Sequence, residues 1–475
     1  MNRIQSVFLS LILALCLLNV LTACSVATTD KDITNDFECP GFLSAMRLIL
    51  DKEESDPIFE SEVMCIEELR LASYTGITSL KGIEYFANLQ ALHVVRQSPD
   101  TQLTEIDVSN NSNLKILNVN CNQLTELNVS KNKNLVALCA RDNQLTSLDV
   151  SNNPNLEHLQ IEENLLSELD ISNNPNLKTL WVQNNQLTEI DISNNPSLEA
   201  LWVMDNNLTE IDVSNHPSLK EFWLENNHLT ILNVVDLPNL EWFNVGNNQI
   251  GEVNISNTPQ LNAINVWENC LIKIDVSGIP SLETLNIWGN QLTEVDLSKN
   301  HSLFSLLAHN NQLKELDLSN NPYLRLMHID NNYLTELDVS KNPRLDCIHA
   351  GNNQLTGINV SYNPDLEYLD VWGNRLTYID ISKNAALVLL RVSDNQISEL
   401  NIDMSYNTRL KMVDVRWNNF TSPDSVTGRQ EDRFSRFRLA QESTEQPFGI
   451  WELGEGFWFY PQNYSLGEKE TTDNN

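Results

Sequence analysis

A leucine recurs every 21 residues along most of this chain, and the interval does not change between Leu114 and Leu387. In the unit that begins at Leu177, apolar residues follow that leucine at positions 4, 6, 11, 14 and 16. The alternation at positions 4 and 6 is typical of a short strand with one buried side. One such unit cannot bury its own leucines, so successive units must stack and share a continuous core.

The rest of the unit predicts the path of the chain between strands. Asn185 occupies position 9, and we expect its buried amide to bond the backbone of a bend and of the next coil. Pro175 and Pro196 recur shortly before the next leucine, where proline disfavours a helix. Each coil is therefore predicted to be a strand, a bend and an extended return.

The unit LKTLWVQNNQLTEIDISNNPS fits the pattern L-x-x-L-x-L-x-x-N-x-L. On these residues, the chain resembles bacterial leucine-rich-repeat surface proteins and is internalin-like in general plan. The resemblance covers residues 66–420. It implies a solenoid with a parallel concave β-sheet and an extended, helix-poor convex side. The resemblance leaves the ligand open, and we expect no cofactor and no bound metal.

The N-terminus predicts export. An apolar run in residues 1–23 follows a single basic residue, Arg3, as in a secretory signal. The run ends in LTAC, which resembles the lipobox of bacterial lipoproteins and implies that Cys24 carries a lipid. Residues 24–38 then form the lipidated cysteine and a flexible tether. The location expected is the bacterial cell envelope, lipid-anchored, with the cell surface favoured.

Both ends of the array are predicted to be capped. Residues 39–65 contain apolar side chains at helical spacing and are expected to form a helical N-terminal cap. Cys39 and Cys65 flank this segment, and export favours a disulfide between them. Its acidic loop, residues 51–62, partly matches a calcium-binding loop, but Asp56 replaces the required glycine. Residues 421–475 are expected to form a β-rich C-terminal cap and tail.

The outward side of the sheet is where a ligand is expected. Positions 4 and 6 point into the core, so positions 3, 5 and 7 point outward. Six tryptophans occupy these outward positions in six successive coils, with polar neighbours beside them. The predicted ligand-binding residues are Trp181, Trp202, Trp223, Trp242, Trp267, Trp288, Glu162, Gln183, Glu221 and Glu225.

The amino-acid composition limits which classes of molecule this chain is expected to bind. The formal net charge of −34 excludes the basic footprint that nucleic-acid binding requires. We expect a protein partner, because exposed tryptophans and carboxylates suit a protein that carries Lys or Arg. A glycan is the alternative ligand, and a purely structural stack of tryptophans is another interpretation. A second alternative function is polysaccharide cleavage by paired carboxylates such as Glu162 and Glu225.

A row of histidines occupies outward positions further along the array, at His309, His328 and His349, with Asp330 and Asp370 nearby. Imidazoles and carboxylates on adjacent strands are potential ligands of a transition metal or members of a pH-sensitive patch. The sequence lacks a tight metal-binding motif, so the interpretation adopted is a variable polar surface. The array cysteines are expected to be separate thiols.

Overall fold

The computed structural model describes residues 30–95, 102–401, 406–420 and 426–427. These residues belong to one compact unit, Cys24–Gln441. The predicted signal peptide, Cys24 and residues 428–475 of the predicted C-terminal cap lie outside the described residues. No helix in the described ranges has both the length and the apolarity that a bilayer crossing requires.

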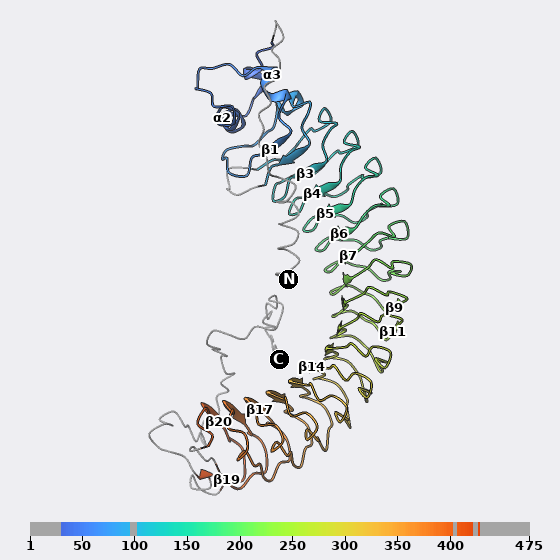
Figure 1. Cartoon of the computed structure of the whole chain (residues 1–475), viewed down its shortest axis with the longest axis vertical. Helices are drawn as coiled ribbons and strands as arrows, with labels where there is room; N and C mark the ends of the chain where they lie inside the picture. Colours follow the sequence, from blue (N-terminus) through green and yellow to red (C-terminus); the bar gives the residue numbers. More distant parts are fainter. Residues whose placement is uncertain (1–29, 96–101, 402–405, 421–425, 428–475) are drawn as a thin grey trace, which may run out of the picture. The chain divides into compact units, whose positions relative to one another are not determined.

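Successive coils each contribute one short strand to a 17-stranded parallel sheet on the inner side of the curving stack (Figure 1). Each strand pairs with the strand of the coils before and after it. The strands of this sheet are β1 (Glu68–Arg70), β2 (Ala91–His93), β3 (Ile116–Asn118), β4 (Ala137–Cys139), β5 (His158–Gln160), β6 (Thr179–Trp181), β7 (Ala200–Trp202), β8 (Glu221–Trp223), β10 (Trp242–Asn244), β12 (Ala263–Asn265), β13 (Thr284–Asn286), β14 (Ser305–Leu307), β15 (Leu326–His328), β16 (Cys347–His349), β17 (Tyr368–Asp370), β18 (Leu389–Arg391) and β20 (Met412–Asp414). The predicted leucine-rich-repeat solenoid is confirmed.

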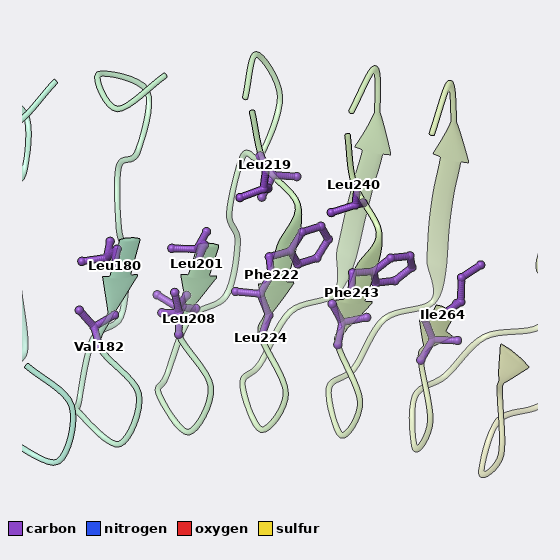
Figure 2. Close-up of a cluster of buried hydrophobic side chains, with 14 of the residues drawn as sticks. Leu180, Val182, Leu201, Leu208, Leu219, Phe222, Leu224, Leu240, Phe243 and Ile264 are labelled. Atoms are coloured by element: carbon purple, nitrogen blue, oxygen red, sulfur yellow. The ribbon is translucent and has the colours of Figure 1, made fainter. Parts of the chain in front are cut away.

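The core runs through the stack as the leucine period predicts. Position 4 is buried in every coil before the last one, where Val413 is partly buried, and Phe222 and Phe243 replace leucine there in two adjacent coils. Their rings stack with centroids 5.3 Å apart. Figure 2 shows the two side chains on neighbouring coils among the other core residues. Complete burial of one such side chain contributes roughly 1.5–3 kcal/mol to folding. Because each coil contributes a similar free energy of burial, these contributions add up along the stack and stabilise the whole array.

Two rows of buried asparagines tie each coil to the one before it. Asn206, at position 9, donates to the Val182 and Val203 carbonyls at 3.0 and 3.2 Å, and its Oδ1 accepts from the Leu187 N–H. The amide therefore bonds a bend and a neighbouring coil, as predicted for position 9, but that coil is the preceding one rather than the next. A second row, at position 19, was not predicted. Asn195 in this row donates to the carbonyls of Ile171 and Asn174.

The return path is extended, as predicted, and in the described coils after the first it contains no helix. In two adjacent coils it forms further strands, β9 (Ile231–Val235) and β11 (Glu252–Ser256), which pair in parallel as a separate two-stranded sheet (Figure 1). In these coils the second asparagine row is interrupted by Leu237 and Thr258. A further pair, β19 (Leu400–Asn401) and β21 (Val426–Thr427), lies near the C-terminal end of the described chain.

The N-terminal cap is helical, as predicted, and contains η1 (Thr34–Asp36), α2 (Pro40–Ile49) and α3 (Glu60–Met64), with η2 (Ile83–Tyr85) in the first coil. The predicted tether is too long: Ile33 and Phe37 are buried in the core, so residues 30–38 belong to the cap. The segment is otherwise polar, so the sequence did not predict that these two apolar residues are buried.

The predicted disulfide between Cys39 and Cys65 is absent. The Cys39 thiol instead donates to the Gly76 carbonyl at 3.3 Å, and its sulfur accepts from the Thr78 N–H at 3.4 Å. These bonds join the cap to the first coil. In the acidic loop, Glu62 forms an ion pair with Lys52 and accepts from the Phe59 N–H, so this carboxylate already has partners.

Candidate functional site

The outward side of β6 to β13 carries the predicted tryptophans and is called the tryptophan face below. Parallel register places Trp181, Trp202 and Trp223 directly opposite one another on β6, β7 and β8. The indoles of Trp181 and Trp202 stack with centroids 4.5 Å apart and planes 7° apart. Trp223 continues the stack at 5.9 Å from Trp202 but is tilted by 48°. These three tryptophans, called the first ladder below, therefore lie side by side at the outward positions predicted for them.

This stack is more covered than the alternation of side chains suggested. Trp181 and Trp202 are only 8% and 6% exposed, because each ring covers a face of its neighbour. Aromatic recognition of cations uses the ring face. Trp181 and Trp202 therefore offer only the edges of their rings to a ligand. The tilted indole of Trp223, at one end of the stack, offers more of its ring face.

A second stack extends along position 7. Trp267 and Trp288 are 5.3 Å apart with planes 8° apart, and His309 stacks on Trp288 at 5.1 Å. The other side of Trp267 lies on Gly246, where an added Cβ atom would sit 2.1 Å from the indole Cε2. Trp372 lies in the same way on Gly351. Glycine at position 7 thus creates space for an indole from the next coil.

Trp242 is the exposed member of the tryptophan face, with 47% of its surface accessible. It occupies position 3 on β10, beside Glu221 of β8 and Ala263 of β12. Burial raises the pKa of the Glu221 carboxyl, and the nearby Trp223 and Trp202 indoles oppose that rise. Glu221 is therefore a poorly solvated carboxyl group beside the stacked tryptophans, opposite Trp242 in the register.

Two further predicted carboxyl groups are poorly solvated. Burial raises the pKa of Glu162 to about 7, although Arg141 lies 3.8 Å from Glu162 Oε1 and opposes the shift. Burial also raises the pKa of Glu225 to about 8. Within the described chain, one carboxyl oxygen of each has no hydrogen-bond partner. Such groups favour a ligand that supplies a proton donor or a positive charge.

The sheet geometry weakens the case for glycoside cleavage. Glu162 and Glu225 belong to coils that are three strand spacings apart, or about 14 Å. Hydrolysis by paired carboxyl groups needs a separation of roughly 5–9.5 Å. Gln183 is half-buried in the intervening coil that carries Trp181. The predicted polar residues therefore surround the first ladder rather than converge on one reaction centre.

The histidine row is also assembled as predicted, and it continues from the second stack. His309 lies 6.3 Å from His328, and His328 lies 4.3 Å from His349, measured between ring centroids. Burial lowers the pKa of His309 to about 4, of His328 to about 3 and of His349 to about 4. Cys347 joins this group from position 3, an outward position at which the sequence interpretation considered only tryptophan and glutamate.

Known proteins share this architecture. Residues 175–216 match the family model for leucine-rich repeats in two copies. The functional domain of InlJ from Listeria monocytogenes is 28% identical, covering 79% of this chain and 84% of that chain, with a TM-score of 0.70. YopM from Yersinia enterocolitica is 25% identical, covering 81% and 92%, with a TM-score of 0.56. No curated protein matches the chain.

A plant peptide hormone receptor, RGFR1, solved in complex with RGF2, is 21% identical, covers 74% of this chain and 65% of that chain, and has a TM-score of 0.60. At this identity the likeness concerns the fold alone. The repeat, the sheet and these neighbours define the chain as a leucine-rich-repeat solenoid. In particular it is internalin-like in general plan, as the sequence predicted. The InlJ domain includes a cysteine ladder, whereas the buried rows that link the coils of this chain consist of asparagine.

Proposed function

We propose that this solenoid binds a protein partner, without catalysis, through the tryptophan face. The observation that carries the proposal is the exposed indole of Trp242 beside the stacked tryptophans and the Glu221 carboxyl. Tryptophan is enriched at the centres of protein interfaces, and exposed apolar patches with polar borders mark contact sites. Leucine-rich-repeat folds typically bind proteins, and RGFR1 was solved with its peptide partner.

The chemistry of the face favours a partner segment that carries Lys or Arg. The chain has a formal net charge of −34, which attracts basic partners over long range. A cationic side chain near Glu162 or Glu225 stabilises the ionised carboxyl that burial otherwise disfavours. The covered faces of Trp181 and Trp202 leave less surface for a sugar ring, which favours protein over glycan.

The proposed setting is the bacterial cell envelope, with the chain exported and held by a lipid on Cys24. This part of the proposal depends on the apolar N-terminal run and the LTAC sequence. Metabolic labelling with a fatty acid tests it: wild-type protein should take up the label and Cys24→Ser should not. Equal labelling of both proteins would remove Cys24 from the proposal.

Capture with the chain from Ser25 onward tests the binding function. Envelope proteins retained by the wild-type chain are identified by mass spectrometry, and the same chain is applied to a glycan array. We expect a defined protein to be retained, and to be lost from the Trp242→Ala variant. Binding to polysaccharide with no retained protein would instead establish the glycan alternative. Release of sugar products would establish the enzyme alternative.

A further inference from the structure

Three metal-ligating side chains meet on the outward side of two neighbouring strands, beyond the tryptophan face. His328 ends β15, and Cys347 and His349 begin and end β16. Parallel register places His328 opposite His349. Cys347 lies two residues before His349 on the same strand, so both side chains emerge from the same side of the sheet.

The donor atoms of these three residues are already close. One ligand atom from each residue lies within 4.8 Å of the others, and His328 Nε2 is 3.9 Å from the Cys347 sulfur. Zn²⁺ bonds to nitrogen at about 2.0–2.1 Å and to sulfur at about 2.3 Å, which places tetrahedral donors about 3.3–3.7 Å apart. Small side-chain rotations therefore convert the observed arrangement into a coordination site.

We propose that His328, Cys347 and His349 bind a divalent transition-metal ion of the Zn²⁺ class. Two imidazoles and one thiolate form a ligand set that suits Zn²⁺ and Co²⁺ and disfavours Mg²⁺ and Ca²⁺. Three protein ligands leave the fourth tetrahedral position open on the inner side of the solenoid, where water or a partner's side chain completes the coordination. The site does not depend on the protein-binding proposal.

The neighbouring charged groups leave this site available. Asp330 lies near the cluster, but its Oδ1 accepts a hydrogen bond from the Gly351 N–H at 2.8 Å. Arg391 is the nearby cation on β18, and its guanidinium forms ion pairs with Asp370 at 3.3 Å and Asp414 at 3.7 Å. The three donors are each partly buried, which limits competition from water.

Titration of the full chain with Co²⁺ tests this site, using protein without a histidine tag. Wild-type protein should bind one equivalent and show a thiolate-to-cobalt charge-transfer band together with the intense d–d bands of tetrahedral coordination. Cys347→Ser should lose the charge-transfer band, and His349→Gln should bind Co²⁺ at least about tenfold more weakly. Cys270→Ser is the matched control, because this thiol is exposed elsewhere on the array.

A stability measurement keeps the proposal testable if a substitution perturbs the fold. Zn²⁺ should raise the melting temperature of the wild-type and Cys270→Ser proteins, since a ligand that binds the folded state stabilises it. The same addition should leave Cys347→Ser and His328→Gln unchanged. The proposal is overturned if wild-type protein shows neither band nor stabilisation, or if the charge-transfer band persists in Cys347→Ser.

Discussion

The indole of Trp267 lies directly on the backbone of Gly246, at the same position of the preceding coil. An added methyl group at Gly246 would meet that ring at 2.1 Å, well inside van der Waals contact. Trp288 and then His309 stack on the other side of Trp267. One glycine therefore supports the whole second stack, and its substitution tests whether the stack is a tightly packed unit.

Gly246→Ala should destabilise the chain by about 1–3 kcal/mol, the usual cost of overpacking, because the Trp267 indole must move. Urea unfolding measures this loss, and near-ultraviolet circular dichroism should show that the indole stack has changed. Gly251→Ala is the control, since an added methyl group there meets no atom within 4 Å. Equal unfolding curves for wild type and Gly246→Ala would show that the stack adapts freely.

Trp242→Ala and Trp202→Ala should separate binding from stability on the tryptophan face. Both substitutions should weaken binding of the captured partner by about 2 kcal/mol or more. Trp202→Ala should also lower the free energy of unfolding by about 3 kcal/mol, because its indole is buried, whereas Trp242→Ala should change it little.

Calorimetric titration and urea unfolding measure the two effects of these substitutions. Trp417→Ala provides a control at an indole that is exposed near the C-terminal end of the array. If partner affinity survives both face substitutions while Trp202→Ala loses stability, the tryptophan stack has only a structural role.

The contribution of Glu225 to stability should fall as pH rises through the neutral range. Burial raises the folded-state pKa of Glu225 from its ordinary 4.5 to about 8, so the folded chain retains a proton that the unfolded chain releases. Between pH 5 and 8 the folded state therefore binds more protons at Glu225, and the contribution of this group to the free energy of unfolding decreases. The loss attributable to Glu225 should be about 3–4 kcal/mol.

Glu225→Gln should remove this part of the pH dependence, and unfolding curves at pH 5 and pH 8 measure the difference between the two proteins. Glu210→Gln, at an exposed position outside the tryptophan face, should retain the wild-type dependence. An identical pH dependence of stability in wild type and Glu225→Gln would mean that the Glu225 carboxyl is already ionised at pH 5.

Asn206→Ala should destabilise the array by about 1–3 kcal/mol. The substitution leaves the buried Leu187 N–H without its side-chain partner, and such a group costs about 1–3 kcal/mol. The Val182 carbonyl loses one of its two amide donors, because Asn185 also donates to it. Hydrogen exchange should also increase at the Leu187 amide. Asn207→Ala is the control, because the neighbouring side chain is exposed. An unchanged Leu187 amide would show that water replaces the asparagine.

The 21-residue leucine period predicted the fold because each coil carries the same leucines, which it can bury only by stacking on its neighbours. Alternation also predicted which side of the sheet carries Trp181 and Trp202. It did not predict how far the rings cover one another, because ring orientation depends on contacts between coils. The contact between Trp267 and Gly246 could not be predicted for the same reason, because these residues meet only through the register of two neighbouring coils.

Other differences have equally local causes. Ile33 and Phe37 are isolated apolar residues in a polar segment, so no periodic pattern reveals their burial. Cys347 is one of several scattered thiols until the pairing of β15 with β16 places it beside His328. The second asparagine row did have a sequence signal, the asparagine that repeatedly precedes proline, as in Asn195.

The bonds from each buried asparagine to the preceding coil have a mechanical consequence. Because Asn206 joins its own coil to the Val182 carbonyl of the coil before, tension applied along the stack loads these links in series. A stretched molecule should therefore release one coil at a time from an end. Each release would free 21 residues, or about 70 Å of extended chain. The solenoid would therefore lengthen in steps under tension and dissipate mechanical energy at each step.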